Sequence, residues 1–139
     1  MRTIVSDLMT TKVISLFEEQ TLPLASGIMQ LKKVRHLPVV DDDGTLVGLV
    51  THRDLLRSQG TLFSLLHSGQ HTQVELEVPV REIMTKDVWT VKPETKLLDA
   101  GRLLADHQFS CLPVTDGGGR LVGIITDRDY LKFALEVLK

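Results

Sequence analysis

Short aliphatic runs of strand length are the clearest pattern along this chain. Residues 37–40 and 46–50 are two such runs, and Asp42-Asp43-Gly44 separates them. Asp-Gly between two apolar runs is typical of a β-hairpin. The arrangement returns at residues 112–115 and 121–125, where a glycine-rich turn again joins the runs. The pattern therefore predicts two hairpins.

Ahead of each hairpin, apolar residues recur at helical spacing. We expect these helices to begin after Thr21 and after Thr95, each acting as an N-cap. Residues 13–16 and 88–91, which precede them, have the composition of short strands. The apolar helical positions are Ala25, Ile28 and Met29 in one case and Ala100, Leu103 and Leu104 in the other.

These elements form an internal repeat with an offset of 75 residues, so that Val5 falls on Val80 without a gap. A further helix is expected after Thr51 and after its equivalent, Thr126. Each copy then reads strand, helix, strand, strand, helix. We therefore predict an α+β fold of two βαββα repeats, packed with pseudo-twofold symmetry so that each sheet buries its apolar face.

The predicted division of the chain is a first repeat at 1–58, a linker at 59–79 and a second repeat at 80–139. Within the linker, residues 62–66 could continue a helix, and residues 70–73 are polar. Residues 74–78 alternate apolar and charged side chains, which indicates an extended segment.

Charge and composition narrow the function classes. Lys and Arg number 16 and Asp and Glu number 18, giving a net charge of -2, which disfavours a nucleic-acid binder. No apolar run is long enough to cross a bilayer, so no membrane partner is expected. The single cysteine and the absence of a signal-peptide pattern at the N-terminus indicate a cytoplasmic protein.

The repeated motifs resemble those of the CBS domain, and specifically a tandem pair, or Bateman module. Leu37-Pro38-Val39-Val40-Asp41 followed by Gly48-Leu49-Val50-Thr51-His52-Arg53-Asp54 carries the resemblance in the first copy. Leu112-Pro113-Val114-Thr115-Asp116 and Gly123-Ile124-Ile125-Thr126-Asp127-Arg128-Asp129 carry it in the second. The similarity extends over residues 5–135.

The resemblance implies a non-catalytic regulatory module. Such pairs bind adenosine-containing ligands, for example AMP, ADP, ATP or S-adenosylmethionine, in clefts between the repeats. They associate further, commonly as disc-like dimers, and usually regulate an attached enzyme or channel, so that a homodimer is expected for this chain. Here we expect the regulated partner to be a separate, unknown chain and no cofactor to be required. The alternative is a structural or dimerisation module whose clefts stay empty.

Thr51 and Asp54 stand three residues apart at a helix start, as do Thr126 and Asp129. A capping box alone explains both pairs, with threonine and carboxylate each accepting from a backbone amide. The resemblance implies instead that they contact a ribose, whose two hydroxyls suit a carboxylate acceptor. The two roles are compatible.

A phosphate needs cations, and the repeats supply them unequally. The resemblance points to Arg35 and His36 before the first Leu-Pro as phosphate contacts, and Arg53 and Arg128 are further candidates. Because the clefts lie between repeats, Arg35 could serve a ribose held by either copy. By the same resemblance, the base pocket draws on Lys12, Val13 and Pro38 in one copy and on Asp87, Val88 and Pro113 in the other.

Other groups of residues give weaker indications of function. His67 and His71 stand four apart without a third ligand, so we predict no metal site. Cys111 with His107 suggests a thiol nucleophile, but a cysteine at a strand start is more often a small buried hydrophobe. No nucleophile, base and orienting group occur in a recognisable set, so we predict no enzymatic activity.

Overall fold

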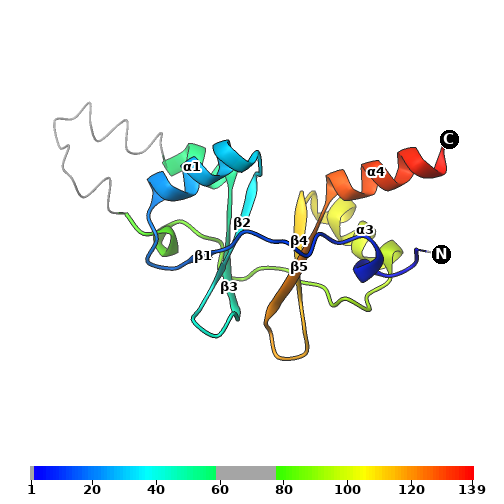
Figure 1. Ribbon diagram of the computed structural model, residues 1–139, viewed down its shortest axis with the longest axis horizontal. Coiled ribbons are helices and arrows are strands. Elements are labelled where there is room, and N and C mark those ends of the chain that lie inside the picture. Colours follow the sequence, from blue (N-terminus) through cyan, green and yellow to red (C-terminus); the bar gives the residue numbers. More distant parts are fainter. Residues whose placement is uncertain (1, 59–77) are drawn as a thin grey trace. The chain divides into compact units, whose positions relative to one another are not determined.

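The computed structural model describes residues 2–58 and 78–139, which group into two compact units (Figure 1). The linker predictions for residues 62–77, including His67 and His71, therefore lie outside the described residues. Of the described residues, unit 1 comprises 2–13, 44–46 and 88–139, and unit 2 comprises 14–43, 47–58 and 78–87. The mixed helix and strand content and the repeated element order confirm the predicted fold class.

Unit 2 contains the first hairpin, apart from Gly44–Leu46, and the elements packed on it. The strand order of its sheet is β1-β2-β3. Strand β1 pairs with β2 in parallel, with Leu16 opposite Val39. The elements are β1 (Leu16–Phe17), α1 (Leu22–Lys32), β2 (His36–Val40), β3 (Leu46–Thr51), a helix at residues 52–58 and the 3₁₀ turn η3 (Val80–Glu82).

Unit 1 contains the second hairpin, in which β4 and β5 are antiparallel with Cys111 opposite Thr126. Gly44 and Gly119 in the two hairpin turns have φ of 83° and 85°, a conformation that favours glycine, as the Asp-Gly pattern predicted. The elements of unit 1 are the 3₁₀ turn η1 (Val5–Asp7), α3 (Leu97–His107), β4 (Cys111–Thr115), β5 (Leu121–Thr126) and α4 (Asp127–Val137).

The N-cap residue of the first helix was predicted correctly in the first repeat and wrongly in the second. Thr21 is the N-cap residue of α1, although its side chain makes no capping hydrogen bond. The N-cap of α3 is Lys96, so the prediction for Thr95 is wrong. The Thr95 hydroxyl instead accepts from the Lys92 amide at 2.9 Å, which closes the turn before the helix.

The prediction of strands at residues 13–16 and 88–91 is wrong in length, because fewer of these residues pair with a neighbouring strand than expected. Only Leu16 and Phe17 pair with β2, and only Val91 pairs with β4. Val91 makes both of its backbone hydrogen bonds with β4. Its amide donates to the Pro113 carbonyl, and its carbonyl accepts from the Thr115 amide. Extending the parallel ladder towards Trp89 would need an amide proton from Pro113, which has none. Pro38 occupies the same position in β2.

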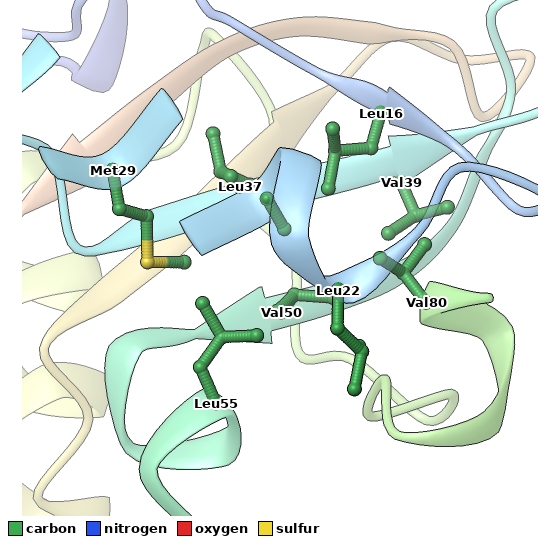
Figure 2. Packing of buried hydrophobic residues seen from close by; sticks show 9 residues of the cluster. Leu16, Leu22, Met29, Leu37, Val39, Val50, Leu55 and Val80 are labelled. Atoms are coloured by element: carbon green, nitrogen blue, oxygen red, sulfur yellow. The ribbon is translucent and has the colours of Figure 1, made fainter. Parts of the chain in front are cut away.

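The two hydrophobic cores use equivalent positions, with one exchange between the repeats. Val5, from the start of the first repeat, is fully buried in the core of unit 1, and Val80, from the second repeat, is fully buried in that of unit 2 (Figure 2). The core of unit 2 consists of Leu16, Leu22, Ala25, Met29, Leu37, Val39, Val50, Leu55 and Val80. That of unit 1 consists of Val5, Val91, Leu97, Ala100, Leu104, Leu112, Val114 and Ile125.

Backbone hydrogen bonds hold the exchanged opening segments in place. In unit 1, Thr10 and Ile124 exchange two bonds of 2.9 Å. In unit 2, Leu49 and Thr85 do the same at 3.0 and 2.9 Å. The compact units therefore cut across the repeats. The division at 1–58, 59–79 and 80–139 remains a prediction about the sequence repeat.

Gly48 and Gly123 permit this close approach. A methyl group at Gly48 would meet the Met84 side chain and lie 3.1 Å from the Thr85 carbonyl oxygen. At Gly123 it would lie 2.7 Å from the Met9 sulfur and 3.0 Å from the Thr10 carbonyl oxygen. The methionines can move, but the carbonyls belong to the paired backbone, so packing favours glycine at both positions.

We expect Gly48→Ala and Gly123→Ala each to lower the free energy of unfolding by about 1–3 kcal/mol, because each overpacks a paired segment. Gly27→Ala is the matched control, since a methyl group there meets nothing within 4 Å. In the middle of α1 it should stabilise the protein by roughly 0.5–1 kcal/mol. Urea unfolding of the three variants checks this, and equal behaviour of all three would contradict it.

Candidate functional site

The strongest candidate site in unit 2 is built where β3 ends and the next helix begins. The Thr51 amide donates to Asp54 Oδ2 at 2.9 Å, and the Asp54 amide donates to Thr51 Oγ1 at 3.2 Å. This is the reciprocal capping box that the sequence spacing predicted. Both residues are half-buried, so the cap remains open to solvent on one side.

Unit 1 repeats this geometry at the start of α4. The Thr126 amide donates to Asp129 Oδ2 at 2.9 Å, and the Asp129 amide donates to Thr126 Oγ1 at 3.2 Å. In both caps one carboxylate oxygen, Oδ2, accepts the backbone amide. Within residues 2–58 and 78–139, Oδ1 of Asp54 and of Asp129 has no hydrogen-bond partner. Each cap thus retains an available acceptor.

The residues before β2 lie beside the first cap. The His52 amide donates to the Arg35 carbonyl at 2.9 Å, which joins the start of β2 to the start of the helix. Arg35 and Arg53 are exposed, and His36 is half-buried. We define the first cap region as Arg35, His36, Thr51, His52, Arg53 and Asp54. All six residues belong to unit 2.

The second cap region is the equivalent set: Ser110, Cys111, Thr126, Asp127, Arg128 and Asp129. The Asp127 amide donates to the Ser110 carbonyl at 3.0 Å, as His52 does to Arg35. Arg128 is exposed, and Cys111 is buried. All six residues belong to unit 1.

Cys111 behaves as the small buried hydrophobe that the sequence suggested. Burial, and secondarily the charge of Asp127, raises the pKa of its thiol to about 12, so it stays protonated at neutral pH. His107 packs against other rings, with centroids 4.6 Å from Trp89 and 5.1 Å from Phe109. The fold thus gives Cys111 no thiolate character.

The predicted base-pocket residues fall in both units. Pro38 and Pro113 are fully buried in β2 and β4, where they pack as part of the sheet. Val13 and Val88 are half-buried and belong to unit 1. The exposed pair, Lys12 and Asp87, is divided between unit 1 and unit 2. The Val91 amide, three residues after Val88, donates to the Pro113 carbonyl at 3.1 Å.

Sequence reasoning assigned no role to Asp127, and the structure gives it one. Its Oδ1 accepts the Arg128 amide at 2.7 Å, at the first turn of α4. The equivalent residue of the first copy is His52, which has no carboxylate. This substitution in the 75-residue repeat was the available signal.

Two kinds of feature are absent from residues 2–58 and 78–139. No helix there is both long and apolar enough to span a membrane. Within the same ranges, no cluster of three or more His, Cys, Asp or Glu side chains is arranged to hold a metal ion.

The chain matches parts of longer curated proteins. A homoserine O-acetyltransferase of Methanococcoides burtonii is 35% identical over 127 residues, which cover 91% of this chain and 23% of the enzyme. The chloroplastic CBS domain-containing protein CBSX2 of Arabidopsis thaliana is 39% identical over 123 residues, covering 76% of this chain and 52% of that protein. The chain thus spans about a quarter of the first protein and half of the second.

Two solved structures share the whole fold. CBSX2 in complex with AMP superimposes with a TM-score of 0.82 at 33% identity, covering 98% of both chains. The CBS domain pair of protein MJ0100, in complex with 5′-methylthioadenosine and S-adenosyl-L-methionine, gives a TM-score of 0.80 at 25% identity, covering 99% of both chains.

The family model of the CBS domain matches the chain twice, at residues 5–60 and 80–136. Each match contains one hairpin and one reciprocal Thr-Asp cap. Together with the shared fold, these matches establish that the chain belongs to the CBS domain family and carries the domain as a tandem pair.

Proposed function

We propose that this CBS pair is a non-catalytic regulatory module that binds an adenine nucleotide, such as AMP, ADP or ATP, and acts on a separate partner protein. The observation that carries the proposal is the pair of Thr-Asp caps, each with an available carboxylate oxygen at a half-buried position. The neighbouring structures support it, because CBSX2 holds AMP and MJ0100 holds two adenosyl compounds.

The ribose contacts would be Thr51 and Asp54 in one copy and Thr126 and Asp129 in the other. A ribose presents two adjacent hydroxyl donors, and a carboxylate with one uncommitted oxygen can accept from them while its other oxygen caps the helix. The capping bonds hold each carboxylate in one position before a ligand arrives, which reduces the entropy lost on binding.

The phosphate contacts would come chiefly from the first cap region. Arg35 and Arg53 are exposed cations beside Thr51, and His36 adds a ring that accepts or donates a hydrogen bond. Arg128 is the matching cation of the second copy. Charge-assisted bonds to phosphate are about twice as strong as neutral ones, so the first copy is favoured for a phosphorylated ligand.

The base would contact Lys12, Val13 and Pro38 in one copy and Asp87, Val88 and Pro113 in the other. Adenine is flat and largely apolar, and half-buried valines with backbone donors and acceptors suit it. The free, buried Cys111 fits a reducing compartment such as the cytoplasm.

A structural module with empty clefts is the second candidate. It is favoured by one observation: each Thr-Asp pair satisfies its own capping bonds without any ligand. Ligand binding separates the two candidates directly.

We expect AMP at about 100 times its dissociation constant to stabilise the protein by roughly 2.7 kcal/mol. This gives a rise in Tm of several degrees in a thermal-shift assay. Asp54→Asn should abolish most of the rise, because it replaces the ribose acceptor while leaving an amide oxygen to cap the helix. Arg35→Ala should weaken AMP by roughly tenfold, since a charge-assisted bond is lost.

Arg81→Ala is the matched control, because this exposed arginine of unit 2 lies outside the first cap region. It should leave the AMP affinity unchanged in calorimetry. Absence of any shift with AMP, ADP, ATP, adenosine and S-adenosylmethionine would favour the structural module instead.

We also expect added ATP to remain intact during incubation, because the sequence contains no recognisable set of nucleophile, base and orienting group. Chromatography of the nucleotide after several hours checks this. Turnover that persists through purification and disappears in a single-residue variant would contradict the non-catalytic assignment.

We further infer a homodimer, supported by an apolar stripe on α4. Leu131 and Leu135 are 60% and 58% exposed, and Leu138 at the end of the helix is 78% exposed. These positions recur at spacings of four and three and so share one helix face. Three exposed leucines in a row are unusual for a surface that faces water.

Leu135→Lys should therefore yield particles of about the monomer mass of 15.5 kDa in light scattering, whereas the unaltered protein gives twice that value. Phe17→Lys is the control, since Phe17 is also exposed, at 46%, but lies on β1. A monomeric wild-type protein at micromolar concentration would refute the dimer.

A further inference from the structure

The second cap region carries its own anion at the start of α4. Asp127 Oδ1 accepts the Arg128 amide at 2.7 Å. The first amides of a helix are ordinarily unpaired, and together with the helix dipole they attract negative groups. In α4 a carboxylate of the chain itself already provides that negative group.

The amides of the first turn of α4 are consequently all committed. Asp127 donates to Ser110 at 3.0 Å, Arg128 donates to Asp127, and Asp129 donates to Thr126 at 3.2 Å. A phosphate arriving at this end of the helix would meet no available amide and would approach the Asp127 carboxylate directly.

The neighbouring side chains reinforce this effect. Ser110 and Cys111 replace Arg35 and His36 of the first copy, and burial keeps the Cys111 thiol protonated by raising its pKa to about 12. The charge of Asp127 contributes secondarily to the same shift, which places this carboxylate within electrostatic reach of Cys111.

The formal charges of the two cap regions therefore have opposite signs. With histidines neutral, Arg35 and Arg53 outweigh Asp54 in the first, whereas Asp127 and Asp129 outweigh Arg128 in the second. Like charges repel, and because Asp127 is exposed, added salt should weaken this repulsion. The Thr126-Asp129 cap itself keeps the geometry of the first copy.

We propose that Asp127 makes the second cap region selective for adenosine ligands whose 5′ substituent carries no negative charge. The ligand class is adenosine itself or a 5′-thioether or sulfonium derivative of it. This inference rests on the proposed function, since it assumes that the Thr126-Asp129 pair holds a ribose. It adds a specificity residue and a division of ligands between the two copies.

The test uses the full chain with Asp54→Ala, which removes the first ribose contact. Calorimetry with 5′-methylthioadenosine and with AMP should show the thioether binding at least tenfold more tightly. Adding Asp127→His, which restores the residue found in the first copy, should reduce that preference by roughly tenfold. Asp127→Asn removes the charge at constant size and should act in the same direction.

Asp99→His is the matched control, because Asp99 is an exposed acid of unit 1 in the first turn of α3. In the Asp54→Ala chain it should leave the preference unchanged. Circular dichroism of each variant verifies folding, and the ratio of the two affinities is insensitive to a uniform loss of binding.

Equal affinities of AMP and 5′-methylthioadenosine in the Asp54→Ala chain would overturn the proposal, as would a preference unaffected by both Asp127 substitutions. Failure of the proposed function looks different: the unaltered protein would bind neither compound.

Discussion

Each hydrophobic core of this protein is completed by a valine that the other repeat supplies. Val5 closes the core around α3 and β4, and Val80 closes the core around α1 and β2. The paired segments that follow these valines lie against Gly48 and Gly123, where an added methyl group would be tightly crowded. The hairpins, and with them the two caps at the ends of β3 and β5, depend on this exchange for their packing.

The caps show how one local device serves two purposes. Thr51 with Asp54 and Thr126 with Asp129 start helices by satisfying backbone amides, and each leaves one carboxylate oxygen uncommitted. The scaffold is the same in both copies. What differs is the local charge, because Arg35 and His52 of the first copy are replaced by Ser110 and Asp127 in the second.

Much of this could be predicted from the sequence because the informative residues act locally. The Asp-Gly turns and the Thr-x-x-Asp caps depend on neighbours within a few positions. The extent of β1 and the N-cap of α3 could not be predicted in this way. The first depends on a missing amide proton at Pro38, in a strand 22 residues away from Leu16. The N-cap of α3 depends on the turn before the helix, where the Thr95 hydroxyl accepts from the Lys92 amide and so does not cap the helix. Aligning the two repeats does not reveal that Val5 and Val80 exchange cores, because the two valines are equivalent positions of the repeat.

The exchanged valines also bear on how the chain folds as it is synthesised. When residue 58 has emerged from the ribosome, the first repeat is complete in sequence but its core still lacks Val80. The N-terminal segment, in turn, has no core to join until β5 has been made near residue 125. Contacts of such long sequence separation slow folding and leave apolar surface uncovered in the meantime. Neither core can therefore be completed from the first repeat alone: one has to wait for Val80 and the other for Ile125.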